Sequence, residues 1–145
     1  MSMGCPLLDQ LTHRSFDDDG VHIVELDVTE VMRGPGGTVH GGLVASLVDR
    51  AGAYAVARDS QRPVATSNVA LSYLASANGG PLRAAATTLR IGRRQGVAEV
   101  KVYDAGRGDR LVATAVITLS YLSDDSVQPR VGRVPAVMAP EPPAG

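Results

Sequence analysis

A histidine and several glycines stand directly before an almost uninterrupted apolar stretch that contains one carboxylate. In GGTVHGGLVASLVDRAGAYAV, Gly36 to Val56, the turn carries His40, Gly41 and Gly42, and Asp49 lies in the apolar part. The first N–H groups of a helix have no internal partner and lie at the positive end of its dipole. Glycine lets a ligand approach them closely, so such a terminus can hold an oxyanion.

Asp49 is the candidate acid of this segment. Its neighbours one helical turn away are all small, namely Ala45, Ser46, Gly52 and Ala53. Small neighbours leave room for a substrate or a partner chain beside the carboxylate. A carboxylate that activates water next to an oxyanion site is suited to acyl transfer. The alternative is that Asp49 only pairs with Arg50 or Arg58 on the helix surface.

Other sites of known pattern are excluded by the surrounding residues. A phosphate-binding P-loop needs a lysine, and none lies in or near the turn. The dinucleotide fingerprint needs glycine where Val39 stands, and no Gly-x-Ser-x-Gly motif occurs. Three scattered histidines and the single Cys5 provide neither a zinc cluster nor an intrachain disulfide.

The composition is that of one globular domain. The chain has 145 residues, of which 44% are hydrophobic and 20% charged, with a net charge of −1. This charge argues against nucleic-acid binding. No apolar run reaches the roughly 18 residues of a membrane span, and no signal peptide is evident. A cytoplasmic protein without membrane contact is expected.

The elements that must position these residues follow from hydrophobic periodicity. Alternation over Val21–Val28 predicts a strand, with His22 as a surface or edge residue. A loop of Gly and Pro then precedes a buried helix from Gly42 to about Arg58. Four antiparallel strands with short glycine-bearing turns are expected at Val64–Leu74, Leu82–Ile91, Val97–Tyr103 and Arg110–Leu122.

This order predicts an α+β fold in which a curved antiparallel sheet of five to six strands wraps around one long central helix. A single-layer sheet would leave its other face exposed to water, which predicts a homodimer. Residues 1–20 are expected as an N-terminal segment, 21–123 as the domain and 124–145 as a Pro-rich flexible tail. The acidic turn FDDDGV is expected to be solvated and to hold no metal.

The stretch GTVHGGLVASLVDRAGAYA resembles the signature of the PaaI-like group of hotdog-fold acyl-CoA thioesterases. Their Asn-Pro-x-Gly-x-x-His-Gly-Gly loop is followed by an aspartate on the central helix. The strand ATSNVALSYLASA and the last three strands are also similar to the family, so the resemblance covers roughly residues 20–122. It implies hydrolysis of a thioester to free acid and coenzyme A, without a separate cofactor or metal, because coenzyme A is part of the substrate.

The resemblance also implies a role for each matching residue. Asp49 matches the catalytic acid, which acts as nucleophile or as general base to water. Gly41 matches the residue whose N–H polarises the thioester carbonyl, and His40 and Gly42 match the residues that shape the loop. Thr66 matches the strand residue that positions the attacking water. In the family these groups meet across a dimer interface, which implies a homodimer with composite sites and a dimer of dimers.

The chain departs from the family pattern at two positions. Gly34 stands where the loop asparagine is found, and Ser76 stands where proline follows the Tyr-Leu step. Loss of the asparagine implies a lower rate, a shifted substrate choice or transfer of its role to His40. It also supports the alternative of a non-catalytic acyl-CoA-binding or regulatory domain. A hydratase fits less well, because no second Asp/His motif is found.

Three arginines, Arg90, Arg93 and Arg94, lie where relatives hold the phosphates of coenzyme A. Guanidinium groups suit a pyrophosphate or a 3′-phosphate, but each is also explained as a solvated hairpin residue. Tyr54 and Tyr73 are candidates for an acyl pocket or for ordinary apolar packing. An acyl-carrier thioester is as compatible with the pattern as an acyl-CoA, and the acyl group stays open.

Overall fold

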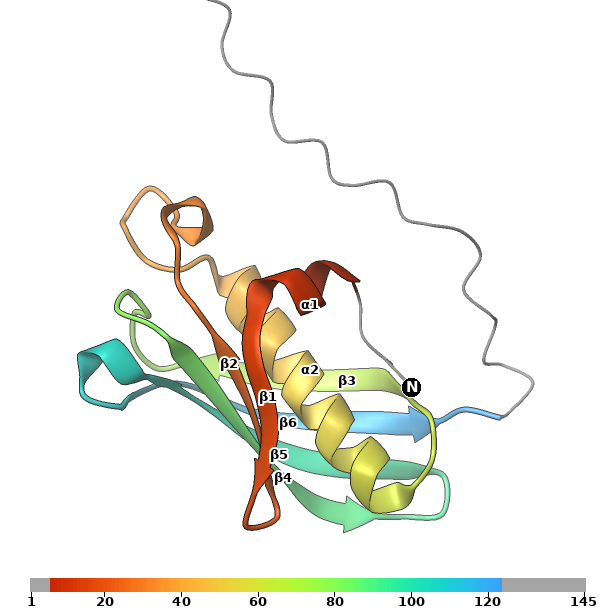
Figure 1. Cartoon of the computed structure of the whole chain (residues 1–145). Helices are drawn as coiled ribbons and strands as arrows, with labels where there is room; N and C mark the ends of the chain where they lie inside the picture. Colours follow the sequence, from red (N-terminus) through yellow and green to blue (C-terminus); the bar gives the residue numbers. More distant parts are fainter. Residues whose placement is uncertain (1–5, 124–145) are drawn as a thin grey trace, which may run out of the picture.

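A computed structural model gives the structure of the protein and describes residues 6–123 (Figure 1). The tail predicted at residues 124–145 lies outside the described residues. In chain order the elements are α1 (Pro6–Leu11), β1 (Thr12–Asp18), β2 (Val21–Leu26), the 3-10 helix η1 (Glu30–Met32), α2 (Gly41–Ser60), β3 (Val64–Tyr73), β4 (Leu82–Ile91), β5 (Gln95–Asp104), the 3-10 helix η2 (Ala105–Arg107) and β6 (Arg110–Tyr121).

The six strands form one antiparallel sheet in the order β1-β2-β4-β5-β6-β3. The helix α2 lies across one face of this sheet, which curves around it (Figure 1). The predicted α+β architecture, a curved sheet around one long helix, is confirmed. The strands predicted after the helix are also found, with ends that differ by at most two residues.

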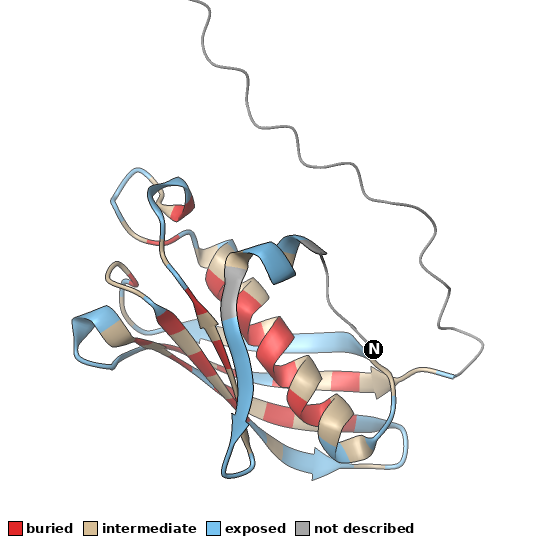
Figure 2. Ribbon diagram, in the orientation of Figure 1, coloured by how far each residue is buried: buried red, intermediate tan, exposed pale blue. Residues whose placement is uncertain are grey.

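The helix α2 is buried on the side that faces the sheet, as Figure 2 shows in red. A Cβ atom on Gly52 would collide with Ile117 Cγ2 of β6, so the missing side chain lets the helix approach the sheet closely. Gly52 therefore serves the core, and the sequence interpretation that it leaves room beside Asp49 was wrong. Within residues 6–123 no helix combines the length and the hydropathy that a membrane crossing requires.

The strand β1 was not predicted, because its residues THRSFDD have no apolar alternation. It pairs with β2 through a two-residue turn in which Asp19 and Gly20 both have positive φ, 45° and 79°. His22 on β2 is only 6% exposed. The expectation of a surface position for His22 was wrong, because β1 covers its edge and Tyr54 of α2 stacks on its ring.

The strand β3 forms the other end of the sheet. It pairs with β6 on one side, and nothing in the described part of the chain pairs with its outer edge. Eight of its ten residues are exposed, which Figure 2 shows as an almost continuous pale blue strand. A strand with an open row of backbone groups is a ready surface for pairing with another chain.

Candidate active site

The loop before α2 is held in one conformation by its own backbone. The N–H of Gly37 donates to Gly34 O at 3.0 Å, and the N–H of Gly34 donates to Thr38 O at 2.8 Å. Gly37 has φ 75°, a conformation that favours glycine. The Arg33 guanidinium donates to Gly37 O at 2.9 Å and to Asn78 O at 2.8 Å, which fastens the loop to the segment before β4.

His40 is the N-cap of α2. Its Nδ1 accepts the N–H of Gly42 at 3.0 Å, and its carbonyl oxygen accepts the N–H of Leu43 at 3.0 Å. Because Nδ1 is an acceptor here, the neutral ring carries its proton on Nε2. The N–H of Gly41 has no acceptor among residues 6–123 and stays available to a ligand.

Tyr73, at the end of β3, contacts this helix terminus. Its hydroxyl donates to Gly41 O at 2.6 Å. A Cβ atom on Gly41 would lie 3.1 Å from that hydroxyl oxygen, so the tyrosine leaves little room for any other residue at this position. A depression of about 340 Å³ opens beside the pair, with Thr38, Val44 and Val112 among its lining residues. Tyr73 is thus placed at a pocket, whereas Tyr54 packs against His22 instead.

Asp49 lies half-buried on the side of α2 next to β3. Thr66 of β3 donates its hydroxyl to Asp49 Oδ1 at 2.5 Å. The alternative pairing of Asp49 with a neighbouring arginine is not found. Arg50 instead pairs with Asp9 at 2.6 Å, and Arg58 pairs with two other aspartates. The structure therefore brings into contact Asp49, which is expected to activate the attacking water, and Thr66, which is expected to position it.

The predicted site residues form two groups within one chain. Gly34, His40, Gly41 and Gly42 lie at the helix terminus, while Asp49 lies eight residues further along α2. At 1.5 Å per residue, this separation is about 12 Å along the helix axis. One thioester carbonyl cannot contact the Gly41 N–H and a water on Asp49 of the same chain.

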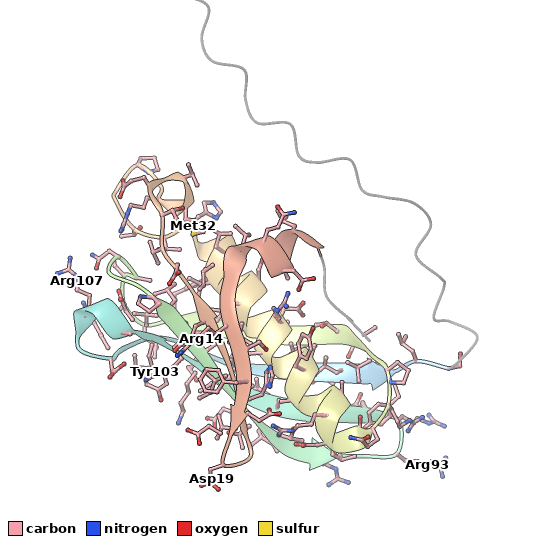
Figure 3. The ribbon with its side chains drawn as sticks, viewed as in Figure 1. Arg14, Asp19, Met32, Arg93, Tyr103 and Arg107 are labelled. Atoms are coloured by element: carbon pink, nitrogen blue, oxygen red, sulfur yellow. The ribbon has the colours of Figure 1, made fainter. Side chains whose placement is uncertain are left out.

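The arginines expected to bind phosphates lie at the opposite end of α2 from the glycine loop. Figure 3 shows Arg93 at the β4–β5 turn and Met32, next to the loop, at the far side of the molecule. Arg90, Arg93 and Arg94 are exposed, and none forms an ion pair within residues 6–123. Positive charge without a carboxylate partner favours an anionic ligand.

Sequence reasoning missed a fourth cation of this cluster. The Arg62 guanidinium donates to Arg93 O at 3.2 Å and lies 4.1 Å from the centre of the Tyr121 ring. Tyr121 faces Val64 in the β3–β6 ladder, so the cluster lies near the end of β3 that carries Thr66. No periodicity marks Arg62, because it stands in the turn between α2 and β3.

No group of residues suited to a metal ion is present in the described part of the chain. The three aspartates of the acidic turn are exposed, as expected, and Asp17 also contacts His22 and Arg58.

The family model of the thioesterase superfamily matches residues 36–111, just over half of the chain. A curated relative, a candidate esterase of Halobacterium salinarum, is 46% identical over 74 residues. This similarity covers 48% of each chain, so the matched segment spans about half the length of that relative. The match includes the loop from Gly36 onward, the helix α2 and Thr66, and it leaves Gly34 outside.

Three solved structures share the fold. The conserved protein PA5202 of Pseudomonas aeruginosa is 29% identical, with a TM-score of 0.73 over 83% of this chain and 96% of that chain. PaaI of E. coli, from the phenylacetic acid degradation operon, is 26% identical, with a TM-score of 0.67 over 76% and 79%. BH2602 of Bacillus halodurans, solved with CoA, is 29% identical, with a TM-score of 0.63 over 69% and 66%. The resemblance drawn from the sequence is confirmed.

Proposed function

Because the chain belongs to the thioesterase superfamily, we propose that it hydrolyses acyl-CoA thioesters to a free acid and coenzyme A. The observation that carries this proposal is the hydrogen bond from Thr66 to Asp49 Oδ1 at 2.5 Å. It fixes the orientation of the carboxylate and leaves Oδ2 to accept a proton. A carboxylate held in this way, beside an open strand edge, is positioned to act as general base to water.

In the proposed reaction Asp49 takes a proton from water as the water oxygen attacks the thioester carbon. The carbonyl electron pair moves to oxygen, and the N–H of Gly41 stabilises the resulting oxyanion at the positive end of α2. The C–S bond then breaks, and the thiolate receives the proton from Asp49. Free acid and coenzyme A leave, and the carboxylate is regenerated.

This chemistry requires two chains, because Gly41 and Asp49 of one chain lie about 12 Å apart along the axis. The open edge of β3 suits antiparallel pairing with a second copy. In a register centred between Val69 and Ala70, Thr66 of one chain lies opposite Tyr73 of the partner subunit. Asp49 then lies near the Gly41 terminus of the partner subunit, and each dimer contains two composite sites. Two such dimers can associate through surfaces that the pairing of β3 with β3 leaves exposed.

The arginine cluster supports coenzyme A as the leaving group. Arg90, Arg93 and Arg94 lie near the Thr66 end of β3, which is where the composite site forms in this register. Their guanidinium groups, which form no ion pair within residues 6–123, suit the phosphates of the coenzyme A moiety. A structural neighbour has been solved with CoA. An acyl carrier protein offers one phosphodiester in place of the nucleotide, and it would engage fewer of these arginines.

A second candidate function is binding of acyl-CoA without turnover, and Gly34 is the observation that favours it. The loop asparagine of the family is absent, so one polar group beside the substrate is missing. The position has space for it, because a Cβ atom on Gly34 would meet only Thr38 O at 3.9 Å. If the protein is catalytic and this group matters, Gly34→Asn raises kcat for the same acyl-CoA.

The decisive experiment measures free thiol released from a panel of short, long and aromatic acyl-CoAs. We expect turnover by the wild type and a loss of at least about 100-fold in kcat for Asp49→Ala, because the general base is removed. Asp59→Asn is the matched control, since Asp59 lies on the same helix but pairs with Arg58. Acyl-CoA binding by the wild type without thiol release would contradict catalysis and favour the binding domain.

A further inference from the structure

A serine, a histidine and an aspartate form a hydrogen-bonded chain on the β1–β2 hairpin. The distance from Ser15 Oγ to His22 Nε2 is 3.1 Å, and the distance from His22 Nδ1 to Asp17 Oδ1 is 2.8 Å. These are the atoms that connect nucleophile, base and orienting acid in serine hydrolases. The proposed thioester reaction uses none of the three residues.

The chemistry of the acceptors determines where the protons lie. The hydrogen bond from His22 is the main cause that lowers the pKa of Asp17, so Asp17 is a carboxylate and can only accept. Nδ1 of His22 therefore carries the ring proton. In the neutral ring Nε2 is then an acceptor, and the hydroxyl of Ser15 donates to it. This arrangement lets His22 remove the proton of Ser15.

The ring of His22 is held in place by contacts with the helix α2 as well as with β1. Tyr54 of α2 stacks on it with ring centres 5.3 Å apart and planes at 13°. The Arg58 guanidinium donates to the same oxygen of Asp17 at 2.5 Å and holds that carboxylate in place. The side chain of His22 is 8% exposed, whereas Ser15 is exposed and can meet a reagent from solvent.

The strand edge supplies hydrogen-bond donors beside Ser15. The two-residue turn at Asp19 and Gly20 makes the residues that flank it a hydrogen-bonded pair. Alternation along the ladder then directs the N–H groups of Asp17 and Ser15 away from β2. Since β1 is an end strand of the sheet, these groups face the open edge. The nucleophile's own N–H is one of the donors that serine hydrolases use for the oxyanion.

We propose that Ser15, His22 and Asp17 form a second acyl-transfer centre that takes small carboxylic esters. The Ser15 oxygen attacks the ester carbon while His22 Nε2 takes the hydroxyl proton. The ester C–O bond breaks, and the alcohol leaves with that proton. Water then attacks the acyl-serine, again with His22 as base, and the acid is released. This centre lies on β1, at the opposite end of the sheet from β3 and Asp49.

The test is covalent labelling of the full chain with diisopropyl fluorophosphate, followed by peptide mass spectrometry and by hydrolysis of p-nitrophenyl acetate. We expect the label on Ser15 and a labelling rate that falls about 100-fold or more in His22→Gln and at least about tenfold in Asp17→Asn. Ser15→Ala must abolish the label. In Figure 3 this hairpin is found from Asp19, which is labelled at its turn.

Three controls make the result specific. Ser67→Ala keeps the label, because the hydroxyl of Ser67, an exposed serine on β3, donates to the backbone oxygen of Thr118. Asp49→Ala also keeps it while thioester turnover is lost, which separates this proposal from the thioesterase. His22 is buried, so thermal melts accompany each variant, and the exposed Asp17→Asn decides if His22→Gln does not fold. Absence of label on Ser15, or an unchanged labelling rate in Asp17→Asn, would overturn the proposal.

Discussion

The hydroxyl of Tyr73 holds the peptide that follows the Gly41 N–H, the group assigned to the oxyanion. Its hydrogen bond to Gly41 O measures 2.6 Å and lies at the mouth of the pocket. Removing the hydroxyl leaves the ring in place but lets the glycine turn move. A neutral hydrogen bond contributes about 0.5–1.5 kcal/mol. Because the Gly41 N–H is assigned to the oxyanion, loss of the Tyr73 hydrogen bond raises the free energy of the transition state more than that of the bound substrate.

We therefore expect Tyr73→Phe to lower kcat about 3- to 10-fold with little change in KM. Steady-state kinetics with one acyl-CoA measures both constants. Tyr103→Phe is the matched control, because Tyr103 contacts Arg83 on another part of the sheet. An unchanged kcat in Tyr73→Phe would show that the glycine turn needs no support from this hydroxyl.

At this scale the sequence predicted residues that lie close together along the chain. The spacing from His40 and Gly41 to Asp49 predicted a helix terminus followed by an acid on the same helix, and both are found. It did not predict the burial of His22 or the contacts of Arg62, because both depend on residues from other elements. The single signal for Thr66 was the family resemblance.

At the scale of elements, one buried carboxylate fastens the loop between β3 and β4. Asp104 at the end of β5 is fully buried and accepts backbone N–H groups, among them those of Asn78 at 2.9 Å, Gly79 at 2.8 Å and Gly80 at 2.7 Å. Burial raises the pKa of Asp104, but these hydrogen bonds outweigh burial and lower the pKa below its ordinary value. The loop borders the proposed pocket, so its anchor also shapes the site.

A folded-state pKa below the unfolded value means that Asp104 stabilises the protein above the unfolded pKa of about 3.9. This contribution is lost as the pH falls through the lowered folded pKa. Asp104→Asn should therefore lower the Tm at pH 7 and reduce the loss of stability in acid. Thermal melts from pH 7 to pH 2, compared with the exposed Asp109→Asn, measure the effect. A parallel decline of wild type and Asp104→Asn would contradict it.

The elements differ in how well the sequence predicts them. The strands that pack on α2 have apolar alternation, and their positions follow from it. The strand β1 lies at the edge of the sheet and has a mostly polar sequence. The turn residues Asp19 and Gly20, just before β2, are the sequence signal that could have indicated it. Gly52 was misinterpreted because the sequence pattern of a small residue is the same in two situations. Such a residue can leave space for a ligand, or it can let a helix pack closely on a sheet, as Gly52 does.

At the scale of the whole molecule, the composite site can be tested by mixing two inactive variants. Asp49→Ala lacks the base, and Gly41→Ala places a Cβ 3.1 Å from the Tyr73 hydroxyl oxygen. In a mixed dimer, one of the two sites receives an intact Asp49 and an intact Gly41 from different chains. If the chains exchange at random, half of the dimers are mixed, and about a quarter of the wild-type activity returns.

Thiol release from the mixture, after unfolding and refolding the two variants together, measures this recovery. Differently tagged chains confirm that mixed dimers form. The control is a mixture of Asp49→Ala with Thr66→Val, because both defects lie in the same half of the site and recovery is not expected. If tagged mixed dimers form without activity, the site is not shared between chains.

The two ends of the sheet carry very different sequences. The ten residues of β3, VATSNVALSY, include no charged side chain, whereas β1 carries Arg14, Asp17 and Asp18, and Asp19 follows at its turn. Charged edges resist pairing with other strands. In the proposed dimer the uncharged edge of each β3 pairs with the β3 edge of the partner subunit. The strand edges that stay exposed are then the charged β1 edges. In that proposed dimer the sheet cannot grow beyond two copies, so the same pairing that completes the site would also oppose fibre formation.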